Sequence, residues 1–290
     1  MTTPRPVSIG TILRKQRLGL RKSLGQNFLK DEHTAWRIVE LSGVKAGDRV
    51  VEIGPGLGSL TQPLLEKAGH IVAIEQDQRM IPPLKERLEG IGTLEVIHGS
   101  GVTMDYTELA NRLGGPIHIV ANLPYQVSSP ILLQLLAHWR SIKTMTLMFQ
   151  REVADRLVAK PATKAYGSLS VQCQTWTVPK KVLTVPPGAF LPPPKVHSAV
   201  VHFTMLQEPA VDIDDIESYR EVIRAAFNQR RKTLRNSMKR VHEASENWLA
   251  RADIDSKRRG ETLSLEEFAR LAKTRPDTES EHLGKKSKTD

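Results

Sequence analysis

Between about residues 49 and 150, short apolar runs alternate with segments of helical periodicity, and this alternation restricts the possible folds strongly. The runs are apolar almost throughout, which is typical of strands buried on both faces of a sheet. Parallel strands of this kind need helical crossovers between them. The sequence therefore predicts a parallel, doubly wound sheet with both faces covered. The apolar runs are RVVEIG (49–54), HIVAIEQ (70–76), LEVIHG (94–99), IHIVANL (117–123) and TMTLMFQ (144–150), and the helical segments are SLTQPLLEKA (59–68), MIPPLKERLE (80–89), YTELANRL (106–113) and SPILLQLLAHW (129–139).

The chain changes character after this region. SAVVHFTM (198–205) follows the proline-rich turn LPPPKV and predicts one more strand. Residues 207–217 are polar and acidic and predict a linker, whereas residues 216 to about 273 are predicted to be wholly helical. The last helix should begin at a capping box, with Ser264 as the N-cap and Glu267 three residues later.

The net charge of +10 is concentrated in two short segments. Residues 1–30 contain seven Lys and Arg and no acid, and residues 220–240 contain eight Lys and Arg against Glu221, so each segment carries +7. A basic excess held in this way indicates a polyanionic partner. Taken alone, it fits a solvated helix face and a charged tail equally well, and it does not distinguish RNA from DNA or an anionic membrane surface.

Composition also bears on location and on metals. The single cysteine, Cys173, excludes an intrachain disulfide and suits a reducing compartment, so we expect a cytoplasmic protein. No apolar run approaches the ~20 residues that span a bilayer, and no membrane association is expected. The Arg-rich, acid-free N-terminus has no apolar signal-peptide core, and an organelle transit peptide is the lesser alternative. The nine His residues form no His-Glu-x-x-His or Cys/His cluster, so no metal site is expected.

The first predicted strand leads into a glycine-rich turn, Gly54-Pro55-Gly56-Leu57-Gly58. Glycines there let the backbone turn sharply and approach a ligand where a Cβ would clash. Glu75 ends the second strand, where a carboxylate can accept hydrogen bonds from two ribose hydroxyls. Residue 59 is Ser, so G-x-G-x-x-G is not met, and no Lys follows as in a P-loop. The pattern favours a nucleoside ligand without a pyrophosphate, such as S-adenosylmethionine. The alternative is a tight turn beside a surface acid.

The fourth strand ends at Asn122-Leu123-Pro124-Tyr125, on the edge where ligands of such sheets bind. An exocyclic base amine is a poor nucleophile because its lone pair is delocalised into the ring. The Asn122 side-chain oxygen and the Leu123 carbonyl can accept its two N–H groups and favour a pyramidal, more nucleophilic nitrogen. Pro124 fixes the turn, and Tyr125 offers a ring on which a base can stack, a contact worth ~1–3 kcal/mol. The turn therefore points to methyl transfer onto a base amine, although taken alone it could simply cap a strand.

Six motifs follow one another along the chain: LGQNFL (24–29), VEIGPGLGSLT (51–61), NLPY (122–125), AYGSLSVQ (165–172), FLPPPKVHSAVV (190–201) and AFNQRRKTLRNS (226–237). In kind and order they resemble the signatures of the small-subunit ribosomal RNA adenine N6,N6-dimethyltransferases, over roughly residues 18 to 275. The resemblance implies an α/β fold, with a class I (Rossmann-like) seven-stranded methyltransferase sheet and a small all-helical C-terminal domain. It also implies S-adenosylmethionine as cofactor and no metal.

The implied reaction places two methyls on each of two adjacent adenosines, in a hairpin loop near the 3′ end of 16S rRNA, during late small-subunit assembly. The implied partner is the small ribosomal subunit precursor with its 16S rRNA, bound by a monomer. The implied division of the chain is a basic extension (1–19), an S-adenosylmethionine-dependent methyltransferase domain (20–206), a helical RNA- and ribosome-binding domain (207–274) and a mobile charged tail (275–290).

The resemblance assigns roles position by position. Asn27 and Leu29 would contact the cofactor from the N-terminal arm, Gly54 would line its methionine end and Glu75 its ribose. Asn122 would serve both the cofactor and the target amine, and Tyr125 and Phe190 would sandwich the flipped adenine. The implied catalytic set is Asn122, Leu123, Tyr125 and Phe190. The implied cofactor set is Asn27, Leu29, Gly54, Gly56, Glu75, Ser100 and Asn122. The implied RNA-binding set is Arg230, Arg231, Lys232 and Arg235.

Ser100 departs from the family pattern, which usually has Asp at the position that receives the amine of the cofactor's adenine. A hydroxyl accepts one hydrogen bond without a charge, so the adenine contact should be weaker, and Asp105, five residues later, should serve another purpose. Two other interpretations stay open: a resistance-type methyltransferase acting on one adenosine of large-subunit rRNA, and a non-catalytic assembly factor on the same fold. A DNA adenine methyltransferase fits less well, because such enzymes usually carry Asp or Ser with two prolines at the turn.

Overall fold

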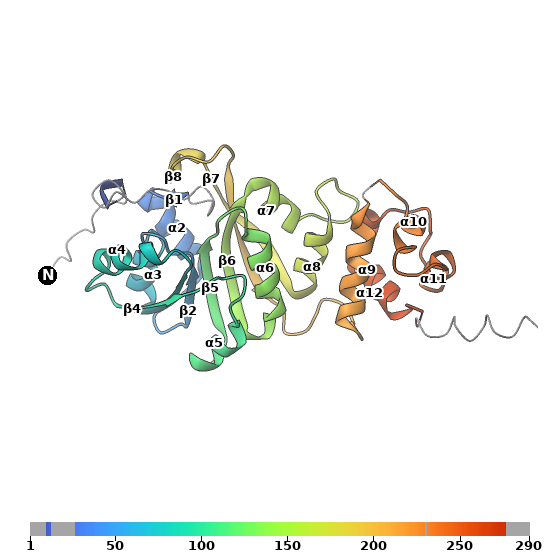
Figure 1. Cartoon of the computed structure of the whole chain (residues 1–290), viewed down its shortest axis with the longest axis horizontal. Helices are drawn as coiled ribbons and strands as arrows, with labels where there is room; N and C mark the ends of the chain where they lie inside the picture. The colour runs from blue at the N-terminus through green and yellow to red at the C-terminus, as the bar shows by residue number, and fades with distance from the viewer. Residues whose placement is uncertain (1–9, 13–26, 230, 277–290) are drawn as a thin grey trace, which may run out of the picture. The chain divides into compact units, whose positions relative to one another are not determined.

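The computed structural model describes residues 10–12, 27–229 and 231–276 (Figure 1). The chain divides into two compact units, of which one comprises the chain to Asp155 with Val178–Gln207, and the other Arg156–Thr177 with the chain from Glu208 onward. The second boundary agrees with the expected linker, but residues 156–177 pack with the later helices. Most of the expected basic extension and charged tail falls outside the described residues. Among the described residues, no helix is long and apolar enough to cross a membrane.

A seven-stranded sheet forms the centre of the first unit, in the order β4-β3-β2-β5-β6-β9-β7. Its strands are β2 (Val50–Ile53), β3 (His70–Glu75), β4 (Thr93–His98), β5 (Ile117–Asn122), β6 (Ile142–Gln150), β7 (Thr177–Val185) and β9 (Ser198–Met205). Every residue of β2 is buried, as are the residues of β3 after His70. Because successive side chains point to opposite faces, both faces are covered there, as the apolar runs predicted.

All six strands predicted from apolar runs are present, and the parallel sheet predicted for residues 49 to 150 is confirmed. Strands β4, β3, β2, β5 and β6 are parallel, whereas β9 pairs with β6 antiparallel, from Thr144–Thr204 to Gln150–Ser198. The chain between β7 and β9 holds only the short 3-10 helix η4 (Pro187–Ala189) and the two-residue β8 (Phe190–Leu191), and no helical crossover. Strand β7 lies at the edge, where Pro179 is tolerated because an edge strand leaves some N–H groups unpaired.

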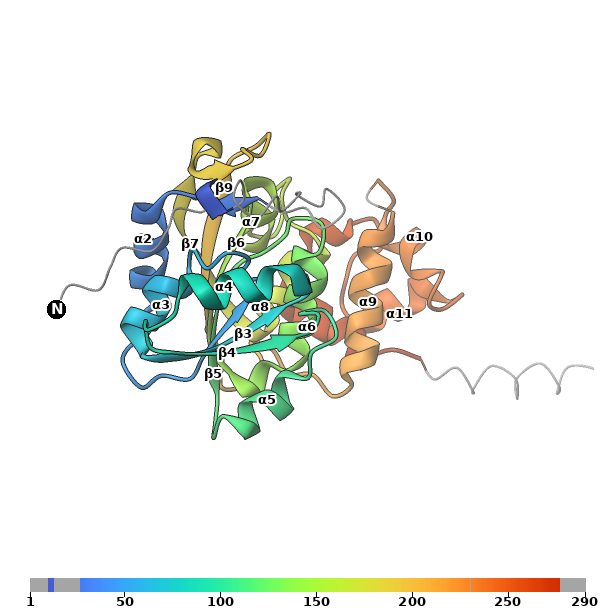
Figure 2. The same cartoon turned by 60° about the vertical axis from the view of Figure 1, so that its left-hand side comes forward.

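The first unit contains the four predicted helices and others that the pattern did not identify. The predicted ones are α3 (Thr61–Ala68), α4 (Ile81–Arg87), α5 (Tyr106–Arg112) and α6 (Ser128–Ala137), and the additional ones are α2 (Glu32–Ser42) and α7 (Arg151–Leu157), which runs across the boundary between the units. Helix α2 has clear end signals, because the Asp31 side chain accepts from Thr34 N and Gly43 ends it at φ 71°. The ribbons of helices α2, α3 and α4 can be followed in Figure 2, and their buried side chains share one cluster with those of the sheet.

A two-residue strand, β1 (Phe28–Leu29), connects the N-terminal arm to the rest of the first unit. It pairs antiparallel with β8, joining Phe28 to Leu191 and Leu29 to Phe190. The Ser59 hydroxyl donates to the Leu29 carbonyl at 2.5 Å, which fixes Leu29 beside the residues that follow the glycine turn. Phe28 and Leu29 therefore lie at the carboxyl ends of the strands, where the ligand is expected.

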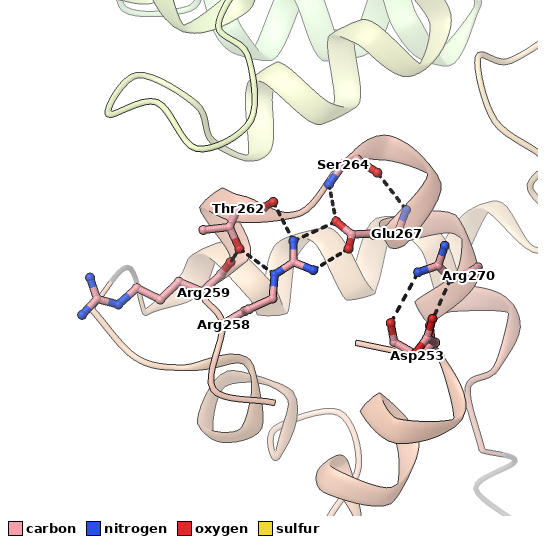
Figure 3. A network of polar contacts seen from close by, with 8 residues as sticks. Asp253, Arg258, Arg259, Thr262, Ser264, Glu267 and Arg270 are labelled. Carbon is pink, nitrogen blue, oxygen red and sulfur yellow. Dashed lines mark hydrogen bonds and ion pairs between the residues drawn. The ribbon is translucent and has the colours of Figure 1, made fainter. Parts of the chain in front are cut away.

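The second unit is helical, as predicted for residues 216 to about 273, and turns separate its helices. Helices α8 (Ser168–Trp176), α9 (Ile216–Asn228), α10 (Leu234–Met238), α11 (Ser245–Arg251) and α12 (Leu265–Lys273) are separated by turns. Backbone N–H groups of Leu234 and Arg235 donate to the carbonyls of Arg258 and Ser256, at 2.7 and 3.0 Å, and so divert the chain from a helical path. The predicted capping box is confirmed: Ser264 accepts from Glu267 N, and Glu267 Oε2 accepts from Ser264 N at 2.8 Å (Figure 3).

Candidate cofactor cavity and RNA-binding residues

The glycine turn places backbone atoms, rather than side chains, at the carboxyl ends of the strands, where the ligand is expected. Gly54 and Gly56 have φ of 69° and 55°, a region that side chains other than glycine's rarely adopt. A Cβ on Gly56 would also lie 2.8 Å from the ring of Phe28, which belongs to the N-terminal arm. The turn can therefore be kept, with the arm closed over it, only if this residue is glycine.

Glu75 fastens this turn to the end of β3. Its Oε2 accepts from Gly56 N at 3.0 Å and its Oε1 accepts from Asp77 N at 2.7 Å. Burial raises the pKa of Glu75, although the backbone hydrogen bonds from Asp77 and Gly56 oppose that rise. Each carboxylate oxygen has a second lone pair, so the group can still accept from two hydroxyls.

One cavity collects nearly all of the predicted site residues at the carboxyl ends of the strands. Its lining includes Asn27, Leu29, Gly54, Gly56, Glu75, Ser100, Asn122, Leu123 and Tyr125. Its acidic side chains are Glu52 and Glu75, and no Lys, Arg or His is among the described residues that line it. Such a cavity offers nothing to neutralise a pyrophosphate and favours a ligand that carries positive charge.

Glu52 is a residue of this cavity to which the sequence analysis gave no role. Its side chain is fully buried, and this burial raises its pKa to about 8; the charge of Glu75 adds to the rise and Thr61 opposes it. Among the described residues, Glu52 Oε2 and Thr61 Oγ1 have no hydrogen-bond partner. The signal was present in the sequence as a lone acid within the apolar run of β2. Buried polar atoms without partners beside a cavity are typical of a site that a ligand completes.

The Asn-Leu-Pro-Tyr turn is held by contacts from both sides. Asn122 Nδ2 donates to the carbonyl of Asn27 at 3.2 Å. Because a carbonyl can only accept, this bond requires the amide nitrogen to lie on the arm side and leaves Oδ1 as a free acceptor. The Tyr125 hydroxyl bonds to Ser198 Oγ at 2.5 Å, and burial raises its pKa, so the phenol stays neutral. The hydrogen bond from Asn122 couples the arm to the acceptor proposed for catalysis.

Three further predicted positions differ in their surroundings. Ser100 lines the cavity, and its Oγ already accepts from Val102 N at 3.3 Å. Asp105 caps α5 by accepting from Thr107 N and Glu108 N, both at 2.9 Å, so it does serve another purpose. Phe190 does not line the cavity, because its ring is fully buried in the cluster beneath the sheet. Its stacking on a base stays a prediction that requires its ring to become exposed.

The predicted RNA-binding residues do not lie on one helix. Helix α9 ends at Asn228, Arg231 and Lys232 are exposed in the turn that follows, and Arg235 on α10 forms an ion pair with Glu246 at 3.3 Å. Arg230 lies outside the described residues. Grouping these cations in one basic helix is therefore wrong, because the break at Thr233 separates the turn from α10.

A second basic segment, residues 256–260, lies beside this turn through the backbone bonds to Leu234 and Arg235. Its two arginines are used differently (Figure 3). Arg258 makes a bidentate ion pair with Glu267 and donates to the Thr262 carbonyl at 2.8 Å, so it braces the start of α12. Arg259 is exposed, and its side chain extends away from this network. Within the described ranges, no three His, Cys, Asp or Glu side chains are grouped so as to hold a metal.

Comparison with known proteins adds independent evidence. The family described as ribosomal RNA adenine dimethylase matches residues 17–275. A Magnetococcus marinus protein named ribosomal RNA small subunit methyltransferase A is 49% identical, over 92% of this chain and 95% of its own. A Clostridium botulinum protein of the same name is 44% identical, over 90% and 96%. Among solved structures, a dimethyladenosine transferase from Plasmodium falciparum is similar with TM-score 0.68 and 27% identity, covering 84% of this chain and 95% of its own. The 23S rRNA methyltransferase ErmE is similar with TM-score 0.64 and 27% identity, covering 86% and 99%.

Proposed function

Because the chain belongs to the ribosomal RNA adenine dimethylase family, we propose that it dimethylates the N6 amines of two adjacent adenosines in the 3′-end hairpin loop of 16S rRNA. The methyl donor is S-adenosylmethionine. The observation that carries this proposal is that Asn122 lines one cavity together with two acidic residues and, among the described residues of its lining, no cation. The names of the curated relatives favour a small-subunit substrate over a large-subunit one.

The residues of the cavity fit this donor. S-adenosylmethionine, when bound, supplies an electrophilic methyl group, and it carries positive charge on its sulfonium and ammonium groups. The unpartnered Oε2 of Glu52 is a suitable acceptor for the ammonium group, and Glu75 for the ribose hydroxyls. Gly54 leaves room at the methionine end, and Ser100 would receive the adenine. Asn27 and Leu29 would close the cavity from the arm.

The turn at the end of β5 would activate the substrate amine. Asn122 Oδ1 and the Leu123 carbonyl accept its two N–H groups, which draws the lone pair out of the ring and toward the methyl. The bond from Asn122 Nδ2 to the arm holds this acceptor in place before the substrate arrives. Tyr125 stacks on the base with its hydroxyl fixed by Ser198. No protein base is required, because the methylated amine is acidic and loses its proton to water.

The exposed cations of the second unit would bind the ribosomal RNA. Arg231 and Lys232 are exposed, and the adjacent segment 256–260 adds the exposed Arg259. Each can contact a phosphate without a change in the fold, whereas Arg258 is engaged in the ion pair with Glu267. We place the activity in the cytoplasm, on the precursor of the small subunit, with the protein acting as a monomer. We also propose that residues 20–206 form the methyltransferase domain, apart from residues 156–177, which pack with the later helices, and that residues 207–274 form the RNA- and ribosome-binding domain.

Methyl transfer to purified ribosomal subunits tests the proposal directly. Small subunits from cells that lack this protein should accept label from S-adenosylmethionine, and digestion should release N6,N6-dimethyladenosine. Primer extension should locate the modification at two adjacent adenosines of the 3′-end hairpin. Large subunits provide the control. Labelling of large subunits in place of small ones, or no labelling of either, would contradict the proposal.

A further inference from the structure

A second hollow lies at the amino ends of the parallel strands, opposite to the carboxyl ends at which the cofactor cavity lies. It is formed by the residues before β2, the starts of β5 and β6, the 3-10 helix η3 (Trp139–Ser141) and the end of β9. The residues that line it are Asp48, Arg49, Pro116, His118, Trp139, Arg140, Ile142, Lys143, Met205, Leu206 and Gln207. All of them belong to the first unit, and none lines the cofactor cavity.

The lining carries an excess of positive charge. Arg49, Arg140 and Lys143 are exposed, and Asp48 is the carboxylate among them. Arg49 Nε donates a hydrogen bond to the carbonyl of Leu113 at 2.7 Å. This bond fixes the side chain and leaves its two terminal nitrogens as donors. Arg140 lies over the ring of Trp139, 4.4 Å from the ring centroid, so its guanidinium is also held in place. Two positioned guanidinium groups and a lysine in one hollow supply the charge and the hydrogen-bond donors that a phosphate requires.

A buried histidine of the hollow has an unused hydrogen-bonding atom. His118 is only 5% exposed, and its Nδ1 bonds to Thr144 Oγ1 at 2.8 Å. Its Nε2 is buried without a hydrogen-bond partner among the described residues. Asp48 Oδ2 lies 3.6 Å away, which is beyond hydrogen-bond distance but within ion-pair distance of a protonated imidazole. Asp48 Oδ2 also accepts from Lys45 N at 2.8 Å. A buried polar atom left unpaired is costly, so a ligand that supplies the missing partner would be favoured.

We propose that this hollow is a phosphate-binding site, in which Arg49, Arg140 and Lys143 hold the phosphate and the Nε2–H of His118 donates to it. This donation requires the imidazole tautomer in which Nδ1 accepts from the Thr144 hydroxyl, 2.8 Å away, and the ring proton is on Nε2. The phosphate belongs either to the ribosomal RNA backbone or to a free phosphate ion, and the chemistry of the site is the same for both. The site is separate from the cofactor cavity, so its existence does not depend on the proposed methyl transfer.

Inorganic phosphate is the first probe. Its dissociation constant follows from the shift of thermal unfolding when phosphate replaces chloride at equal ionic strength. The double variant Arg140→Gln/Lys143→Gln should weaken phosphate binding at least tenfold, because a charge-assisted hydrogen bond is worth about 1.5–3 kcal/mol. The matched control is Lys67→Gln/Lys85→Gln, which removes two exposed lysines of the same unit and should leave the response unchanged. An equal loss in both double variants, or in neither, would overturn the proposal.

Two further variants test the residues beside the bound phosphate. Asp48→Asn removes the one negative charge of the hollow and should tighten phosphate binding, a gain that misfolding does not produce. His118→Phe keeps a ring and removes Nε2, so it should weaken binding. Weaker binding in Asp48→Asn, or unchanged binding in His118→Phe, would contradict the assignment.

Binding to undermethylated small subunits at several salt concentrations identifies the source of the phosphate. If the ribosomal RNA supplies it, Arg140→Gln/Lys143→Gln should lower the log–log salt slope by about 0.7–0.9 per lost contact, and the lysine control should not. An unchanged slope together with the loss of inorganic phosphate binding would identify a site for free phosphate. Both results support the proposal and separate its two sources. If Arg140→Gln/Lys143→Gln loses neither inorganic phosphate binding nor part of the salt slope, the proposal is wrong.

Discussion

Glu52→Gln should change how the stability of the first unit depends on pH. The Glu52 carboxyl is fully buried, and its burial raises the pKa from 4.5 to about 8. The folded protein therefore holds this proton more tightly than the unfolded chain does. The stability that the group contributes is fully present below pH 4.5 and is lost as the pH rises through about 8.

The size of the effect follows from the width of this window. The pKa rises by 3.5 units, from 4.5 to about 8, and one unit corresponds to about 1.4 kcal/mol. Between pH 4 and pH 9 the wild type should lose about 5 kcal/mol of unfolding free energy that the variant keeps, with about 3 kcal/mol already lost at pH 7. Gln is nearly isosteric with Glu, and the cost of burying its amide does not vary with pH. The slope of the difference between the two proteins is therefore the quantity to measure.

Urea unfolding at a series of pH values between 5 and 9 provides this measurement. The two units can unfold separately, so the transition should be followed in the peptide that contains β2, by pulse labelling with deuterium and mass spectrometry. The exposed Glu89→Gln is the control for removing a carboxyl group from the surface of the same unit. A pH-independent difference for Glu52→Gln would refute the reasoning, because it would mean that this carboxyl titrates alike in the folded and unfolded states.

Substitutions at three further places test the other assignments. Asn122→Ala should abolish methyl transfer while leaving S-adenosylmethionine affinity and folding largely intact, measured by a labelled-methyl assay and calorimetry on one preparation; activity within about tenfold of wild type, or ~1.4 kcal/mol in the barrier, would exclude its role. Ser100→Asp should tighten cofactor binding and Ser100→Ala should weaken it modestly, and unchanged affinity in both would remove Ser100 from the adenine site. Arg231→Gln/Lys232→Gln should lower the log–log salt slope of binding to small subunits by about 0.7–0.9 per lost contact, and should leave the cofactor affinity unchanged. Arg235→Gln should lower this slope less. If the double variant has the same slope as wild type, the RNA is bound by the N-terminal arm instead.

The parts of the fold that the sequence predicted correctly are those encoded locally. Six strands follow from continuous apolar runs, because a strand buried on both faces has no polar side to interrupt it. The edge strand β7 has no such run, since Pro179 and two lysines interrupt it, and only the family resemblance indicated a seventh strand. Helix α2 was missed although Asp31 and Gly43 mark its two ends. The direction of β9 depends on how distant strands pair, which periodicity does not report.

The candidate site divides in the same way. The glycine turn, Glu75 and the Asn-Leu-Pro-Tyr turn are short motifs that can be recognised, and the structure gathers them in one cavity. The bond from Asn122 to Asn27 joins residues 95 positions apart, so no local pattern indicates it. The different uses of Arg258 and Arg259 depend likewise on Glu267, which only the folded chain brings within reach of one of them. The burial of Phe190 and the ion pair of Arg235 likewise depend on the folded chain and have no local signal in the sequence.

A buried acid that lowers stability at neutral pH would be retained if binding a cation makes use of it, and this argument leads to a last prediction. At pH 7 most of the Glu52 carboxyl is protonated, since its pKa is about 8. A positively charged group of S-adenosylmethionine placed beside Oε2 favours the ionised form and lowers that pKa. Cofactor binding at pH 7 should therefore release about one proton, and at pH 9 far less, because the carboxyl is then already ionised. Calorimetry in two buffers with different ionisation enthalpies measures this number, and Glu52→Gln should release none. Binding heat that is the same in both buffers at pH 7 would mean that Glu52 does not meet the charge of the cofactor.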